Sequence, residues 1–360
     1  MPTAHQYDAI LVVSFGGPEG HEDVMPFLEN VTRGRNIPRH RLLEVAEHYH
    51  HFGGKSPIND QCRALIAALE AELQAHGPNL PVYWGNRNWR PFLTDTLRQM
   101  KDDGMKRALA FMTSAFSSYS GCRQYRENVR AAQEPLGAGA PVVDKLRAFY
   151  NHPDFIAACA SRVAEAYARL ARQQPDDQQS NAAQLVFTAH SIPMSMAAGC
   201  DYQRQLEESC RLVAESLNIA NYRLVYQSRS GPPTQPWLEP DVLDHLRQIR
   251  SEGAAAVVIA PIGFLSDHME VLFDLDTEAR ALAQELGMRF ERAATVGAHP
   301  QFISMIRKLI VERVNSSEPK RAIGQYPPNH DICPEDCCLP VVRLSSNATS
   351  AVAASRPAAT

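Results

Sequence analysis

Short apolar runs that end in Gly, Ser or Pro alternate with longer amphipathic stretches along most of this chain. In the first half, the apolar runs are AILVVSFGG (9–17), VYWGNRNW (82–89) and ALAFMTSAF (108–116), and residues 60–77 have a helical pattern. Such runs, separated by amphipathic helices, are typical of parallel strands that helices cover on both faces. The first half is therefore predicted to be an α/β unit.

The same alternation starts again in the second half. LVFTAHSI (185–192), RLVYQSRSG (223–231) and AAAVVIAPIGF (254–264) are strand-like, and residues 203–218 have the pattern of a helix. Two βαβ halves of similar length predict two doubly wound domains that face each other.

The domain boundaries are placed where this rhythm breaks. The N-terminal domain is expected over residues 1–145 and the C-terminal domain over residues 146–322. The periodicity fails after about residue 322, so residues 323–360 are predicted to form a cysteine-bearing extension with a disordered tail.

Composition narrows the class of protein. The 360 residues are 44% hydrophobic and carry a net charge of -4, which gives no general attraction to nucleic acid or anionic lipid. The start of the chain does not resemble a signal peptide, and the longest apolar run, 254–265, is too short to cross a bilayer. We expect a cytoplasmic protein, whose eight cysteines are thiols or metal ligands and form no disulfides.

Residues just beyond the predicted strands are the first candidates for chemistry, because open parallel sheets bind ligands at the carboxyl ends of their strands. The segment GGPEG (16–20) matches neither a phosphate loop nor a dinucleotide fingerprint, so no nucleotide cofactor is expected. In FTAHSIP (187–193), His190 ends an apolar run. It is either a hydrogen-bonded structural residue or, beside a carboxylate from another strand end, a metal ligand or proton acceptor.

An acidic row follows the last apolar run. Residues 266–286 are predicted to form a helix with Ser266 or Asp267 near its N-cap. Glu270, Asp274 and Glu278 recur at every fourth position, which puts the three carboxylates on one face of a helix. This face is either a solvated surface or a path for a hard or borderline divalent ion toward the expected cleft.

Six separated motifs resemble those of the ferrochelatases and cover the chain to about residue 315. They are LVVSFGGPEG, PFLENVTRGR, HFGGKSPIN, TAHSIPMSM, YQSRSGPPTQPWLEPD and FLSDHMEVLFDLDTEA. The resemblance implies two flavodoxin-like domains with a porphyrin cleft between them. It also implies insertion of Fe²⁺ into the macrocycle without ATP.

The N-terminal motifs and the cysteine-bearing tail resemble the actinobacterial, coproporphyrin-using branch of that family. This resemblance implies that Fe²⁺ and coproporphyrin III are the substrates and that coproheme III forms with release of two protons. It further suggests handover of coproheme to a downstream enzyme of haem biosynthesis.

The resemblance also implies the catalytic pair. His190 is expected over the porphyrin centre with Glu270 on the same side, where they coordinate iron or receive the two N–H protons. Asp274 and Glu278 then resemble the family's metal path, although Asp274 stands where other members often carry Glu.

Further substrate contacts are expected around the ring. Phe15 and Trp237 are predicted to pack on the macrocycle, with ordinary core positions as the alternative. Phe15 stands near a position where several relatives carry a metal-reaching tyrosine, so tyrosinate ligation is not expected. The other candidates, which are propionate contacts or surface residues, are Arg33, Arg35, His48, Ser56, Arg123 and Tyr125.

Cys333, Cys337 and Cys338 lie within six residues, in CPEDCC. The resemblance implies a [2Fe–2S] cluster with Cys159 as the fourth ligand, and structural zinc or unliganded thiols are the alternatives. The remaining cysteines, interpreted as buried thiols, are Cys62, Cys122, Cys200 and Cys210.

Three other functions stay open at this point. They are a protoporphyrin IX ferrochelatase, a cobalt or nickel chelatase for a sirohydrochlorin-type ring, and a non-enzymatic haem or iron–sulfur sensor. The cobalt and nickel enzymes are expected to present two histidine ligands, whereas this chain offers His190 with Glu270.

Overall fold

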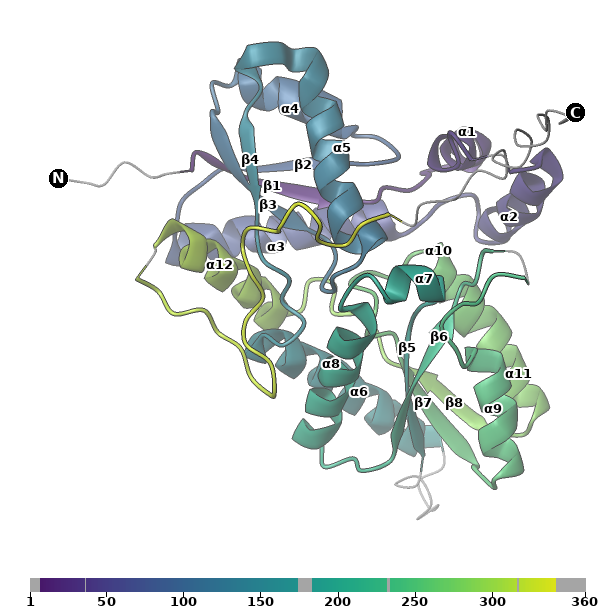
Figure 1. Ribbon diagram of the computed structural model, residues 1–360. Coiled ribbons are helices and arrows are strands. Elements are labelled where there is room, and N and C mark those ends of the chain that lie inside the picture. The colour runs from purple at the N-terminus through teal and green to yellow at the C-terminus, as the bar shows by residue number, and fades with distance from the viewer. Residues whose placement is uncertain (1–6, 36, 174–182, 232–233, 316, 341–360) are drawn as a thin grey trace, which may run out of the picture.

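The computed structural model describes residues 7–35, 37–173, 183–231, 234–315 and 317–340. These residues form two α/β units, each built on a four-stranded parallel sheet with helices on both faces (Figure 1). The fold class expected from the sequence is confirmed. The predicted tail beyond residue 340 lies outside the described residues.

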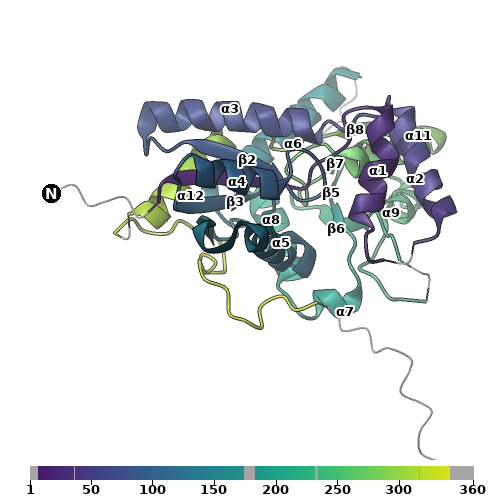
Figure 2. The same cartoon turned by 90° about the horizontal axis from the view of Figure 1, so that it is seen from above.

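The first sheet has the strand order β2-β1-β3-β4. Its strands are β1 (Ala9–Ser14), β2 (Val82–Asn86), β3 (Arg107–Met112) and β4 (Val142–Lys145). Alternate β1 residues pack against α3 (Ile58–His76) on one face and against α4 (Leu93–Asp102) and α5 (Gln124–Gln133) on the other (Figure 2). All six β1 residues are therefore buried, which explains the unbroken apolar run.

The second sheet has the equivalent order β6-β5-β7-β8. Its strands are β5 (Gln184–His190), β6 (Tyr222–Gln227), β7 (Ala256–Ala260) and β8 (Arg289–Arg292). The helix α8 (Tyr202–Ser216) packs on one face, and α9 (Val242–Ser251) and α11 (Arg280–Glu285) pack on the other. The chain order changes direction at β5, so ligands are expected beyond its carboxyl end.

Two helices link the units. The helix α6 (Pro153–Gln173) follows β4 but packs on β7, β8 and α8 of the second unit. Conversely, α12 (Pro300–Val314) follows β8 but packs against α3 of the first unit as well as α6. A buried ion pair between Arg147 and Glu312, with Nε and Oε2 2.9 Å apart, anchors the start of this exchange.

Two short helices lie over the edge of the second unit. They are α1 (His21–Val31) and α2 (Arg39–His51), which pack on each other (Figure 1). The short α7 (Met194–Ala197) follows β5. Among the described residues, no helix is both long enough and apolar enough to span a bilayer.

The acidic segment departs from the predicted regular helix. It comprises α10 (Met269–Val271), the π-helix η4 (Leu272–Ala279) and then α11. The N-cap is His268, whose Nδ1 accepts from the Glu270 N–H at 3.2 Å. Ser266 and Asp267, expected near the N-cap, lie just before it, and the Asp267 carboxylate accepts from Arg292 Nη1 at 2.8 Å.

Candidate active site

His190 and Glu270 meet beyond the carboxyl end of the second sheet. His190 is the last residue of β5, opposite Gln227 of β6, and Glu270 belongs to α10. Nε2 of His190 lies 3.6 Å from Oε1 of Glu270, and their side chains remain 33% and 47% exposed. Both groups are therefore within reach of a ligand.

The other imidazole nitrogen is fixed by the backbone. His190 Nδ1 lies 2.5 Å from the carbonyl oxygen of Ser191, to which it donates in the Nδ1–H state. The Tyr202 hydroxyl donates to the His190 carbonyl at 3.1 Å. These contacts orient the ring so that Nε2 faces Glu270 and the ligand side.

The two side chains hold each other in charged states. Burial favours the neutral imidazole, but the Glu270 carboxylate and the Ser191 carbonyl outweigh it and raise the pKa of His190 to about 9. Burial would raise the pKa of Glu270, but the charge and hydrogen bond of His190 lower it to about 2. Without a ligand, the site is an imidazolium–carboxylate pair at neutral pH.

The next carboxylate in the row has the opposite electrostatics. Burial, with the charges of Glu270 and Glu278, raises the pKa of Asp274 to about 7. Ser228 donates a short hydrogen bond to Asp274 Oδ2, and Gln227 Nε2 donates to the same atom at 3.3 Å. Gln227 Nε2 also donates to the Glu270 carbonyl at 3.0 Å, which ties β6 to the acidic segment.

The first unit covers this site through α2. The His48 ring stacks on Phe273 of η4 with centroids 3.6 Å apart and planes within 8°. Tyr49 lies close enough to Glu270 for burial and that carboxylate to raise the pKa of its hydroxyl. Residues from both units therefore surround the histidine–glutamate pair.

Comparison with known proteins identifies this arrangement. A family model described as ferrochelatase matches residues 7–314. The chain belongs to the ferrochelatase family. A ferrochelatase of Rhodopirellula baltica is 58% identical over 92% of this chain and 93% of its own length. The coproporphyrin III ferrochelatases of Streptomyces coelicolor and Mycolicibacterium smegmatis are each 50% identical, over 93% and 89% of this chain and 94% of each relative.

A solved structure supports the fold at much lower identity. SirB from Bacillus subtilis with Fe³⁺ superposes with a TM-score of 0.53 at 11% identity, over 87% of this ferrochelatase and 98% of SirB. This likeness concerns the fold alone.

The two residues expected to pack on the macrocycle, Phe15 and Trp237, lie against other protein side chains. Phe15 packs edge-on against Phe27 with centroids 6.3 Å apart, beneath the Arg87 guanidinium. Trp237 is 9% exposed, and its Nε1 has no hydrogen-bond partner among the described residues. Both side chains belong largely to packed interiors.

Of the expected propionate contacts, some side chains are exposed and others are buried. Arg33 and Arg35 are exposed, whereas Ser56 is buried and its N–H donates to the Pro18 carbonyl at 2.9 Å. Tyr125 is buried under Arg87, whose guanidinium lies 4.3 Å from its ring centroid.

Arg123 is directed to the C-terminal extension. Its Nη1 donates to the carbonyls of Glu335 at 2.7 Å and Cys337 at 3.1 Å, and its Nε pairs with Glu127 at 2.9 Å. Arg123 therefore holds the cysteine segment against the first unit.

The extension forms a thiol-rich group beside the π-helix η1 (Tyr119–Arg123). Cys337 Sγ lies 3.6 Å from Cys338 Sγ and 4.0 Å from His330 Nε2. The ligand atoms of His330, Cys333 and Cys337 all lie within 4.8 Å of one another. The hydrogen bond with Cys122 lowers the pKa of Cys333 to about 4, and Lys145 and His330 act in the same direction.

Cys159 lies elsewhere. It is in α6 within the main hydrophobic core, which also holds the buried Cys210. Burial alone raises the pKa of Cys159. The thiol that the structure brings to the tail cysteines is Cys122, which sequence reasoning left among the buried thiols.

Several site residues were missed in the sequence. Gln227 and Ser228 follow β6 in YQSRSG, and their position at a strand end was a usable signal. Cys122 follows β3 in SSYSGCRQY and had the same signal. The stacking of His48 on Phe273 had none, because it depends on how the two units meet.

Proposed function

We propose that this protein inserts Fe²⁺ into coproporphyrin III and releases coproheme III and two protons. The observation that carries the proposal is the pairing of His190 with Glu270 at 3.6 Å beyond the sheet. The relatives named coproporphyrin III ferrochelatases support the substrate.

The electrostatics of the pair suggest an order of events. His190 is protonated in the free protein because its pKa is about 9. An arriving dication disfavours the imidazolium, so Fe²⁺ drives the proton from Nε2 to solvent, to which the side chain is 33% exposed, and leaves a neutral imidazole. That nitrogen then coordinates iron or accepts a pyrrole N–H proton, while Glu270 remains anionic beside the iron.

Asp274 and Glu278 are proposed to deliver the ion. Asp274 titrates near neutral pH because burial and two neighbouring carboxylates raise its pKa to about 7. Burial and Asp241 raise the pKa of Glu278 as well. Asp274 can therefore bind Fe²⁺ by giving up a proton, so it does not present a full, permanent charge that would trap the ion.

Steady-state assays of the purified protein, under anaerobic conditions, test the function. Fe²⁺ is supplied with coproporphyrin III or with protoporphyrin IX, and we expect the higher kcat/KM for coproporphyrin III. Preference for protoporphyrin IX would reassign the substrate within the family. Turnover only of sirohydrochlorin with Co²⁺ or Ni²⁺ would indicate the other chelatase class, and turnover of none would favour a sensor.

We further infer that the cysteine group holds a [2Fe–2S] cluster. Four thiols are available as ligands in Cys122, Cys333, Cys337 and Cys338, and thiolates are the donors that such clusters require. The cluster would supply a metal bridge between the extension and the first unit. The competing assignment is a zinc ion held by His330, Cys333 and Cys337.

Two matched cysteine variants separate these assignments. In anaerobically purified protein, Cys122→Ala is expected to abolish the visible absorption and the paramagnetic signal of the reduced cluster. Cys159→Ala, which truncates a core thiol, is expected to retain both. Zinc without inorganic sulfide in the parent protein would refute the cluster, and loss in Cys159→Ala with retention in Cys122→Ala would refute the ligand set.

A further inference from the structure

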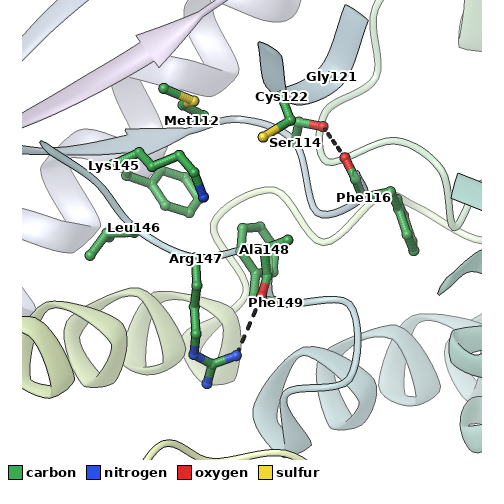
Figure 3. Close-up of a pocket in the computed structure, with 11 residues that line it drawn as sticks. Met112, Ser114, Phe116, Gly121, Cys122, Lys145, Leu146, Arg147, Ala148 and Phe149 are labelled. Atoms are coloured by element: carbon green, nitrogen blue, oxygen red, sulfur yellow. Dashed lines mark hydrogen bonds between the residues drawn. The ribbon is translucent and has the colours of Figure 1, made fainter. Parts of the chain in front are cut away.

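Lys145 places an ammonium group inside the first unit. It is the last residue of β4, opposite Ala110 of β3, and it is 9% exposed. It lines a pocket whose walls include Ser114, Gly121 and Cys122. In Figure 3 the Lys145 nitrogen and the Cys122 sulfur both face the interior of this pocket.

Within the described ranges, no carboxylate compensates the charge of Lys145. Across the part of the chain that the structure describes, no ion pair or hydrogen bond joins the Lys145 ammonium to another residue. The neighbouring Arg147 points away from Lys145 (Figure 3), and its guanidinium is paired with Glu312. Because an unpaired buried charge is strongly destabilising, an anion close to Lys145 is expected.

The anion source beside Lys145 is the cysteine group. Lys145 lies close enough to Cys122 and Cys333 for its charge to act on both thiols. Arg126 adds a second positive charge near Cys333 and Cys337, and its Nε is buried without a partner among the described residues. Arg123 binds the backbone of the same segment. The cysteine group therefore lies among cations.

We propose that Lys145 is the buried counter-charge of the cysteine-bound cluster and sets its retention and reduction potential. This inference rests on the proposed [2Fe–2S] assignment. A four-thiolate cluster of this type is anionic when oxidised and gains a further negative charge on reduction. A fixed ammonium nearby stabilises both states and the reduced state more, so it raises the reduction potential.

The test compares anaerobically purified parent protein with three lysine variants. Lys145→Met keeps the length of the side chain and removes its charge, whereas Lys145→Arg keeps the charge. Lys106→Met removes an exposed lysine of the same unit and is the matched control. Iron and sulfide per chain, the rate of cluster loss to a chelator, and the midpoint potential from a spectroscopic redox titration are measured.

Lys145→Met is expected to lose the cluster several-fold faster and to shift the midpoint potential to more negative values. Lys145→Arg and Lys106→Met are expected to match the parent. A cluster-loaded parent whose potential and loss rate are unchanged in Lys145→Met overturns the inference and leaves the cluster assignment intact. A parent without a cluster overturns both. Faster loss with an unchanged potential would indicate a structural role and would also overturn the inference.

Discussion

His190 Nε2 lies 3.6 Å from Glu270 Oε1, although His190 ends β5 and Glu270 follows β7 of the second sheet. The pairing depends on the parallel arrangement of β5 and β7, whose carboxyl ends share one edge. Gln227 of β6 also fixes the position of Glu270, because its Nε2 donates a hydrogen bond to the Glu270 carbonyl at 3.0 Å.

Removing either member of the pair should abolish most of the turnover. His190→Ala and Glu270→Gln are each expected to lower kcat for Fe²⁺ insertion by about 100-fold or more, in the range for positioned acid–base groups. The exposed His76→Ala is the control. Rates near that of the parent in both variants would remove the pair from the mechanism.

The protonation of His190 should depend on Glu270. Nuclear magnetic resonance of labelled histidine is expected to give His190 a pKa of about 9 in the parent protein. In Glu270→Gln that pKa is expected to fall, because the carboxylate that most opposes the effect of burial is gone. A pKa that does not change between the two proteins would contradict the ion pair.

The same coupling makes stability depend on pH. A raised histidine pKa contributes stability that is fully present below pH 6.5 and is lost as the pH rises through about 9. Urea unfolding should therefore show the parent more stable than Glu270→Gln near neutral pH, with the difference shrinking toward pH 9. A difference that grows over this interval would give the wrong sign for the pair.

Ser228 should tune the metal path. Its hydrogen bond lowers the pKa of Asp274, so Ser228→Ala is expected to raise that pKa further above about 7. The pH at which kcat/KM for Fe²⁺ reaches half its maximum should rise accordingly. Ser251→Ala, at the exposed end of α9, is the control, and an equal shift in both variants would show that Asp274 is not responsible.

The ion pair between Arg147 and Glu312 should be essential for stability. Their side chains are 1% and 3% exposed, so Arg147→Met strands a buried carboxylate and is expected to cost about 3–5 kcal/mol in unfolding free energy. The double variant Arg147→Met/Glu312→Leu should recover part of this loss because no lone charge remains. No recovery would show that packing around Arg147 dominates over charge.

Much of the scaffold could be predicted from the sequence because burial on both faces leaves a direct pattern. β1 and β7 are entirely buried and read as unbroken apolar runs. His190 and Glu270 were predictable as candidates because each lies just beyond such a run.

Contacts between distant segments left no such pattern. The sequence placed the acidic row on a regular helix, but η4 is a π-helix, a form with no periodic signal over eight residues. Cys159 and Cys122 are equally plausible ligands by residue type, and only tertiary placement brings Cys122 to Cys333. Arg123, Ser56 and His48 depend likewise on neighbours that are far away in the chain.

The exchange of α6 and α12 constrains how the protein admits a flat macrocycle. The backbone crosses from the first unit to the second at residues 146–152 and returns at residues 293–299. Two such connections permit the units to bend toward each other but resist twisting and sliding, so the units should open and close along nearly the same path each time. Proteolytic cleavage at one connection would leave the units joined through the other.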